Sequence, residues 1–125
     1  MRIAHLTATF PPYLGGTGRV CYQNALGLAG LGNHVEVFTA DHPAGDHAYP
    51  SELVVHRLPV AFRVGNAPFM PGLFRRLRGF DLVHLHYPFI FGQEMLYLQS
   101  WRRGVRYVIT YHQDVILDGV MGVGI

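Results

Sequence analysis

Five runs of hydrophobic residues follow one another along the chain and predict the strands of a sheet. The first is a short mixed run, and the later ones are rich in β-branched residues; together they cover 2–8, 35–39, 53–58, 82–86 and 105–111. Runs this apolar are typical of strands covered on both faces, as in parallel sheets.

The segment between the first two runs has the periodicity of an amphipathic helix. Over residues 18–32 the apolar positions follow the spacing i, i+4 and i+7, and the resulting stripe contains Cys21, Ala25, Leu28 and, at its widened end, Leu31. Gly32 is a plausible stop, since glycine commonly follows the last helical turn. The pattern predicts one helix packed against the sheet.

Further along the chain, the pattern predicts a second helix over 92–103, closed by Gly104, and a short helix after Pro71. Residues 41–51 are a polar loop. Strands that alternate with longer connections imply right-handed crossovers, so we expect an α/β fold with a doubly wound, Rossmann-like parallel sheet.

Composition narrows the class of protein. The 125 residues are 50% hydrophobic and 14% charged, which fits one folded domain and excludes a disordered chain. The net charge is only +2, so nucleic acid is not an expected partner. A single cysteine, Cys21, cannot form an internal disulfide, and no apolar stretch is long enough to span a bilayer. We expect a cytoplasmic protein.

A glycine-rich segment separates the first strand from the first helix. It runs from Thr9 to Gly18 and contains the adjacent pair Gly15 and Gly16, followed by Thr17. Free N–H groups and the positive end of a helix dipole suit a phosphate, and the loop falls at the carboxyl edge of the sheet, where ligands bind. The alternative is that the glycines only permit positive φ in a long turn.

The same segment is a poor dinucleotide fingerprint. Gly16 and Gly18 supply G-x-G, but Cys21 occupies the position of the third glycine. Asp41, directly after the second strand, could still bind a ribose. A nicotinamide enzyme is therefore disfavoured without being excluded.

His84 and His86 alternate at the end of the fourth strand, so both side chains point to one face. They could share a metal with a further ligand such as Asp114 or His112, and a metal hydrolase of this kind is a rival hypothesis. The alternative is one buried, hydrogen-bonded histidine and one histidine in a cleft.

Polar residues follow the fifth strand and reach the same edge as the glycine segment. His112 can donate to a ligand oxygen or move a proton near neutral pH, and Asp114 can orient it or bind hydroxyl groups. A lone histidine is often structural, so a non-catalytic module that binds phosphate or nucleotide is another rival.

Two further groups have simple interpretations. Arg75, Arg76 and Arg78 could contact anionic lipid at the inner face of a membrane, although a solvated basic face is more common. Packing in the core is the expected role of Cys21 and of the aromatic residues Tyr87, Phe89, Phe91 and Trp101.

Three motifs together resemble a known family. The opening RIAHLTATFPPYLGGTGRVCYQNALGLAGLGNHVEVFTA is similar to the start of the retaining GT-B glycosyltransferases of family 4. DLVHLHYP and YVITYHQD follow in the family's order and at similar spacing. The resemblance covers essentially the whole chain.

The resemblance implies two doubly wound domains that face each other across a cleft, with the acceptor in the first and most of the nucleotide sugar in the second. It implies that Gly15, Gly16 and Thr17 approach the donor diphosphate and that His112 assists transfer. Acceptor contacts would come from Tyr13, His86, Tyr87 and Asp114. Family members need no metal or other cofactor.

We therefore expect residues 1–125 to be an incomplete N-terminal, acceptor-side domain. The donor-binding domain has no counterpart in this sequence, so the segment alone is expected to be inactive. The expected partners are a nucleotide-sugar donor and an acceptor that is a sugar, a lipid-linked molecule or a small molecule.

Overall fold

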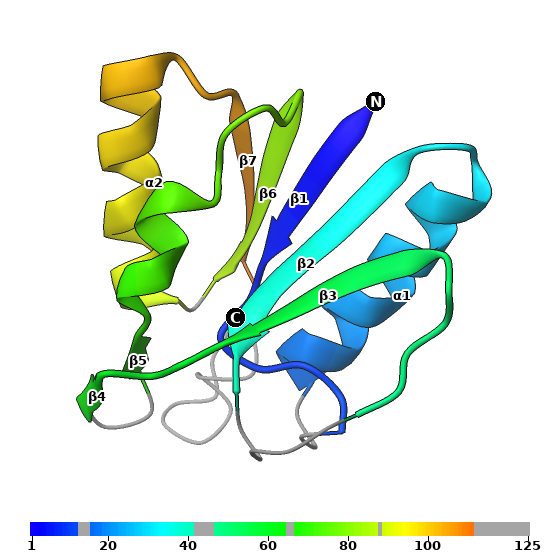
Figure 1. Ribbon diagram of the computed structural model, residues 1–125, viewed down its shortest axis with the longest axis horizontal. Helices are drawn as coiled ribbons and strands as arrows, with labels where there is room; N and C mark the ends of the chain where they lie inside the picture. The colour runs from blue at the N-terminus through cyan, green and yellow to red at the C-terminus, as the bar shows by residue number, and fades with distance from the viewer. Residues whose placement is uncertain (13–15, 42–46, 65–66, 88, 112–125) are drawn as a thin grey trace.

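The protein is a layered α/β domain, seen in Figure 1 as a twisted sheet with helices on both faces. The computed structural model describes residues 1–12, 16–41, 47–64, 67–87 and 89–111. The predicted residues Tyr13, Gly15, His112 and Asp114 lie outside these ranges.

All five strands of the central sheet run parallel, in the order β3-β2-β1-β6-β7. In chain order they are β1 Arg2–Leu6, β2 His34–Ala40, β3 Leu53–Leu58, β6 Leu82–Tyr87 and β7 Tyr107–Tyr111. Each one falls on a hydrophobic run in the sequence. The predicted doubly wound parallel sheet is confirmed.

Two long helices pack against the sheet. Helix α1 spans Gly16–Gly30 and α2 spans Ile90–Arg103. Gly104 ends α2 as predicted, in the left-handed conformation with φ 69°, and its N–H donates to Ser100 O. Because α1 ends at Gly30, Leu31 lies beyond the helix and is 80% exposed, so its predicted place in the apolar stripe is wrong.

The two faces of the sheet carry separate cores. Under α1, the buried group comprises Phe10, Cys21, Ala25, Val35, Val37 and Leu53. The opposite face is covered by α2 and by the short 3-10 helix η1, Pro71–Arg75. Its larger core contains Ala4, Leu6, Phe38, Ala40, Leu58, Met70, Leu73, Leu77, Val83, Leu85, Phe89 and Leu96.

Coverage on both faces holds for the central strands and fails at the edges. Val54 on β3 is 40% exposed and Val108 on β7 is 46% exposed. An outer strand has a neighbour on one side only, so part of its edge stays exposed. The expectation that every strand is covered is therefore wrong for β3 and β7.

A small hairpin is missing from the sequence prediction. Strands β4, Phe62–Val64, and β5, Ala67–Phe69, pair antiparallel. The rings of Phe62 and Phe69 stack with centroids 5.0 Å apart, and Phe91 from α2 meets both edge-on. Strands of three residues are too short to show an alternation, which is why the pattern did not reveal them.

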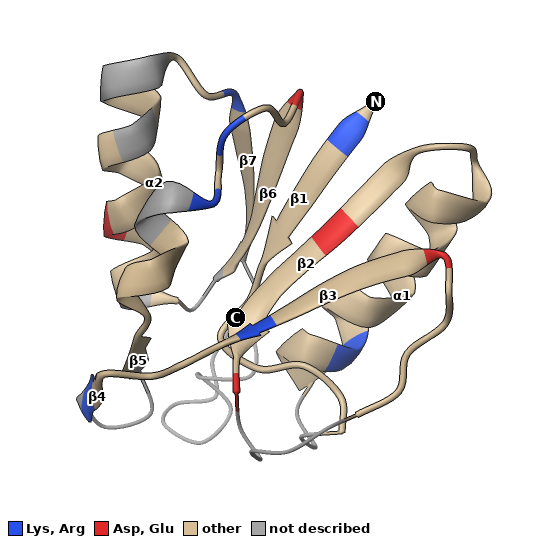
Figure 2. Ribbon diagram, viewed as in Figure 1, with Lys and Arg blue, Asp and Glu red and all other residues tan. Residues whose placement is uncertain are grey.

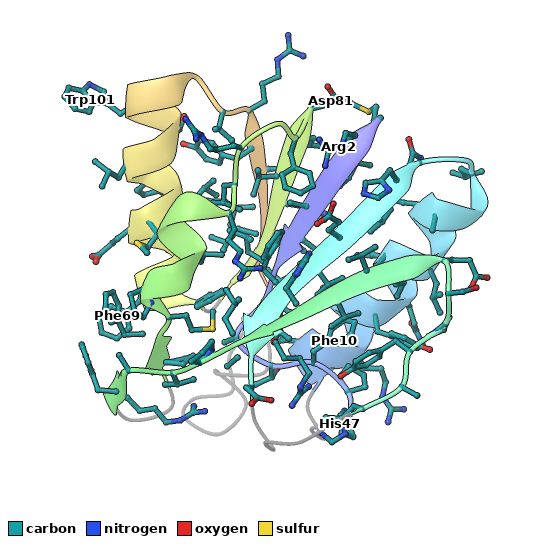
Figure 3. The ribbon with its side chains drawn as sticks, in the orientation of Figure 1. Arg2, Phe10, His47, Phe69, Asp81 and Trp101 are labelled. Atoms are coloured by element: carbon teal, nitrogen blue, oxygen red, sulfur yellow. The ribbon has the colours of Figure 1, made fainter. Side chains whose placement is uncertain are left out.

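The predicted packing roles have mixed outcomes. Cys21 and Phe89 are buried as expected, and Phe91 contacts the hairpin. Trp101 is 84% exposed and points away from α2 (Figure 3), so its predicted packing role is wrong. No helix in the described part of the chain is long and apolar enough to cross a membrane.

Candidate functional site

The sheet order places between β1 and β6 the topological switch point at which open parallel sheets form their ligand crevice. After β1 the chain passes through α1 to β2 on one side, whereas β6 lies on the other side of β1 and continues into α2. Where neighbouring parallel strands lead away in opposite directions, their carboxyl ends leave room for a ligand. The glycine segment predicted as a binding loop follows β1 at this point.

Helix α1 begins at Gly16 beside the crevice. Gly16 is exposed, and a Cβ atom added to it would meet nothing within 4 Å. Thr17 is partly buried in the first turn. The start of α1 is therefore open on its outer side, as an anion-binding helix terminus requires.

Gly18 has the opposite environment, which its place in the G-x-G pattern does not reveal. A Cβ on Gly18 would lie 2.6 Å from Thr9 O and 2.9 Å from Phe10 Cα. The missing side chain lets the first turn of α1 pack directly on the backbone that leaves β1. Gly18 thus fixes the position of the helix, while Gly16 leaves space beside it.

A cavity of about 280 Å³ lies next to this segment. Its walls are Pro11, Pro12, Tyr22, His47, Ala48 and Tyr49. Phe10 packs behind it, with its ring 5.6 Å from those of Tyr22 and Tyr49. This largely apolar cavity lies on the α1 side of the crevice and is a second candidate binding space.

Hydrogen bonds hold the cavity wall in place. Tyr49 Oη donates to Pro11 O at 2.6 Å and accepts from Arg57 Nη1 at 2.9 Å. Arg57 Nε also donates to Asp41 Oδ1 at 3.1 Å. The carboxylate considered as a ribose ligand is therefore engaged by Arg57, which further weakens the nicotinamide alternative.

Three histidines gather under α1, one on β1 and two on β6. His5 Nδ1 and His86 Nε2 share a hydrogen bond of 3.0 Å. The His84 ring lies 4.3 Å from that of His86 and 5.0 Å from that of His5, centroid to centroid. His84 Nε2 also lies 2.6 Å from Thr110 Oγ1 on β7, so the group links three neighbouring strands.

His5 and His86 have no exposed surface, and Cys21 on α1 is equally buried beside them. Burial, and secondarily the nearby His84, lowers the pKa of His5 to about 3, so this ring is neutral at neutral pH. Burial also raises the pKa of the Cys21 thiol. We call these residues the His5–Cys21–His86 cluster.

The metal alternative from the sequence paired His84 with His86. In the structure, His84 is bonded to Thr110, and the donor atoms that converge belong to His5, Cys21 and His86. Sequence spacing could not reveal this set, since His5 and Cys21 lie on other elements. The burial of His86 agrees with the buried, hydrogen-bonded alternative for one of the two histidines.

A second group of histidines lies on the other face of the sheet, around Glu36 on β2. His34 Nε2 and His56 Nε2 each lie 2.7 Å from a carboxylate oxygen of Glu36, and Arg2 Nη2 lies at 3.4 Å. Burial alone would raise the pKa of Glu36. The hydrogen bonds from His34 and His56 outweigh it, and this pKa lies below its ordinary value of 4.5.

The predicted lipid-contact arginines lie away from the crevice. Arg76 and Arg78 are exposed, and Arg76 Nη1 lies 3.5 Å from His56 Nδ1. Next to Arg78, Gly79 O accepts from Arg2 Nη1 at the amino end of β1. Figure 2 shows several basic residues at that end of the sheet, and Figure 3 places Arg2 beside Asp81 there. The side chains of Arg75 and Tyr87 are not among those described.

Comparisons with known proteins agree with one another. The profile of glycosyltransferase family 4 matches residues 14–120. O-antigen chain mannosyltransferase C of Escherichia coli is 32% identical over 123 residues, which are 93% of this chain and 32% of that protein. The fold is similar to a sucrose-phosphate synthase from Thermosynechococcus elongatus, with a TM-score of 0.67 and 19% identity over 97% of this chain and 35% of that one. The chain therefore spans about a third of the length of both.

Proposed function

Because this chain belongs to glycosyltransferase family 4, we propose that it forms the acceptor-side domain of an enzyme that transfers a sugar from a nucleotide diphosphate sugar to an acceptor, with retention of anomeric configuration. The observation that carries this proposal is the open start of α1 at the crevice between β1 and β6. A Cβ atom added to Gly16 there would meet no atom of the described residues within 4 Å.

The chemistry of transfer gives this helix end a task. As the sugar leaves, negative charge accumulates on the nucleoside diphosphate. Preorganised N–H groups that point at the developing charge stabilise the transition state. Gly15, Gly16 and Thr17 would supply such groups, and the positive end of the α1 dipole would add to them.

His112 is the proposed residue beside the transferred sugar. Two positions before it, Thr110 lies in β7 and is held by His84 at 2.6 Å. This hydrogen bond supports the strand end from which His112 follows. We propose acceptor contacts for Tyr13, Tyr87 and Asp114; the burial of His86 favours a supporting role for that residue over the direct contact expected from the resemblance.

The name of the Escherichia coli relative narrows the choice of donor. That protein is a mannosyltransferase, so we propose an activated mannose as the donor of this one. No metal or other cofactor is part of the proposal.

The test is a donor assay on the intact protein with Gly16→Ala and, as a matched control, Gly27→Ala. Gly27 lies exposed in the same helix, and a Cβ atom there also meets nothing within 4 Å. We expect Gly16→Ala to lower kcat/KM for the nucleotide sugar at least tenfold with an unchanged unfolding midpoint. Gly27→Ala should keep full activity.

His112→Ala should lower kcat at least tenfold in the same assay. For the unaltered protein, the NMR coupling of the anomeric proton should show that the product keeps the donor's configuration. Equal kcat/KM in Gly16→Ala and the unaltered protein would remove the phosphate role of α1. Nucleotide-sugar binding without any transfer would favour a binding module instead.

A further inference from the structure

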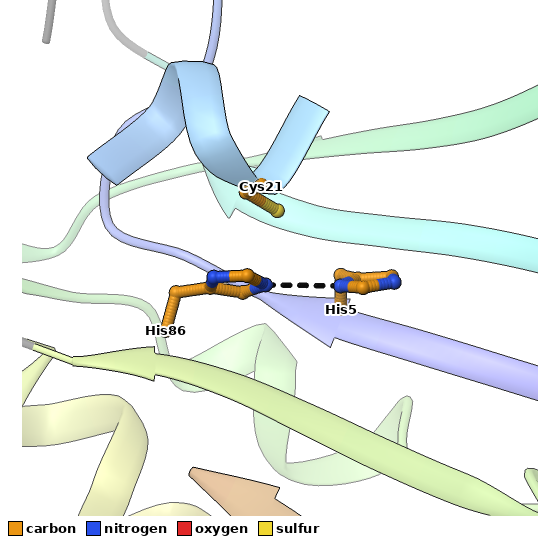
Figure 4. A group of neighbouring side chains, drawn as sticks. All are labelled: His5, Cys21 and His86. Carbon is orange, nitrogen blue, oxygen red and sulfur yellow. Dashed lines mark hydrogen bonds between the residues drawn. The ribbon is translucent and has the colours of Figure 1, made fainter. Parts of the chain in front are cut away.

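The His5–Cys21–His86 cluster brings three metal-ligating side chains together from β1, α1 and β6 (Figure 4). One donor atom of each residue lies within 4.8 Å of the other two. All three residues are fully buried. They lie on regular elements, so their positions are set by the packing of α1 on the sheet.

The distances suit a shared cation. Two imidazole nitrogens bound to one metal at about 2.0 to 2.1 Å with trigonal angles lie about 3.5 to 3.6 Å apart. His5 Nδ1 and His86 Nε2 lie 3.0 Å apart, so a small separation of the rings is enough. Figure 4 shows the Cys21 thiol above this pair and turned toward it.

The tautomer of His5 is not fixed by other contacts. His5 Nε2 is buried and has no hydrogen-bond partner among the described residues. A proton can therefore move between Nδ1 and Nε2 of this ring without breaking a further hydrogen bond. Either ring nitrogen can present its lone pair.

Charge decides which cation fits. Apart from the neighbouring His84 ring, the cluster is buried among apolar residues that include Phe10, Ala25 and Val37, so a net charge there is costly. Both imidazoles are neutral ligands, and Cys21 contributes one negative charge once it loses its proton. A monovalent cation gives a neutral complex, whereas a divalent ion leaves a charge of +1 in the core.

We propose that His5, Cys21 and His86 form a binding site for the soft monovalent cation Cu(I), with trigonal coordination by two nitrogens and one sulfur. Thiolate and imidazole are ligands that copper prefers. On binding, the Cys21 S–H bond breaks, a Cu–S bond forms and one proton leaves to solvent. The His5–His86 hydrogen bond is replaced by two Cu–N bonds, and the ring that donated it carries its proton on its other nitrogen. No oxidation or reduction occurs.

A bound cation would fasten α1 to β1 and β6 directly below the glycine segment. Since binding to the folded state alone raises stability by mass action, the intact protein should unfold at a higher temperature with Cu(I) than without it. This inference does not depend on the transfer reaction.

The test is an anaerobic titration of the intact protein with Cu(I) against a chromophoric Cu(I) chelator, with long equilibration because the site is buried. We expect one site whose affinity falls at least 100-fold in both Cys21→Ser and Cys21→Ala. His34→Gln, which alters an exposed histidine on the other face of the sheet, should bind as tightly as the unaltered protein.

X-ray absorption of the copper-loaded protein keeps the test independent of how well the variants fold. One sulfur and two nitrogen scatterers are expected. Copper without a sulfur ligand, equal affinity in Cys21→Ala, or zinc bound more tightly than Cu(I) would each overturn the proposal. Loss of sugar transfer in an assay would not affect it, and these outcomes leave the proposed function untouched.

Discussion

Two groups of histidines lie on opposite faces of the same sheet and differ in what surrounds them. Under α1, His5 and His86 are fully buried beside a thiol. On the other face, His34 and His56 flank the carboxylate of Glu36 near the open amino end of β2. Burial keeps His5 neutral in the first group, whereas the second group is built around the carboxylate of Glu36.

The difference teaches that the same sequence pattern leads to different chemistry. His84-x-His86 and His34-x-Glu36 each place two polar side chains on one face of a strand. What separates them is the covering layer. Helix α1 covers the first group, whereas His34 and Arg2 in the second group have side chains about half exposed to solvent.

The largest expected effect comes from a substitution that disturbs the packing of α1 on the sheet, because this helix covers the first histidine group. Gly18→Ala should destabilise the protein by about 2 kcal/mol or more, because the new Cβ would overlap Thr9 O. Urea unfolding of the intact protein measures this. Gly27→Ala in the same helix should instead be neutral or stabilising by up to about 1 kcal/mol. Equal stability of the two variants would contradict the close packing at Gly18.

Removing the charge of the second group should have a smaller effect. We expect Glu36→Gln to cost about 1 kcal/mol at pH 7, since Arg2 loses its counter-charge and His34 and His56 lose a carboxylate hydrogen-bond partner. The lowered pKa of Glu36 contributes stability that is fully present above pH 4.5 and is lost as pH falls through the folded-state value.

Urea unfolding at a series of pH values from 7 to 3 tests the sign. The unaltered protein should lose stability below pH 4.5 more steeply than Glu36→Gln. His34→Gln, which leaves the His56 contact in place, should fall between them. Parallel acid profiles in all three would show that these histidines do not act on Glu36.

Loss of the hydrogen bond between His84 and Thr110 on β7 should lower the free energy of unfolding by roughly 0.5 to 1 kcal/mol. Thr110→Val keeps the shape of the side chain and removes the hydroxyl that His84 contacts at 2.6 Å. Thr110→Ser restores the hydroxyl and is the matched control. If both variants unfold at the same urea concentration, the contact contributes nothing measurable.

The smallest expected effect concerns Arg76, which extends the open group through His56. Arg76→Ala should change stability by less than about 0.5 kcal/mol, because exposed pairs contribute little.

The predicted lipid contact is tested separately by sedimentation with anionic vesicles. Arg76→Ala combined with Arg78→Ala should weaken that binding, and retention of full binding would assign it to other residues.

Much of the fold was predictable because each of the five strands of the central sheet falls on an apolar run that is longer than a strand of the hairpin. The β4–β5 hairpin escaped because its pattern is too short to read. Gly16 stands at the start of α1, in agreement with its place between a strand and a helix in the sequence, and its phosphate role stays a prediction. The role of Gly18 was not predictable, since it depends on the backbone of Thr9 that approaches it.

The histidine groups show the same limit. His84 and His86 share one strand, and their alternation is visible in the sequence. His5 joins them only through the pairing of β1 with β6, in which it lies opposite His84. Cys21 joins this cluster only because α1 packs on the sheet. His34 and His56 meet at Glu36 only because β2 and β3 are neighbours. Contacts between elements need a register that periodicity does not contain.

The parallel sheet also gives the domain a direction. Arg78 lies near the amino end of β1, next to Gly79, whose carbonyl contacts Arg2, whereas the start of α1 lies past its carboxyl end. Strands of this kind rise about 3.3 Å per residue, so the two ends are separated by roughly 15 to 20 Å. A bilayer bound at the amino end would hold lipid head groups that far from the crevice. Under the proposed function, an acceptor anchored in such a bilayer would need a tether of comparable length to reach the crevice.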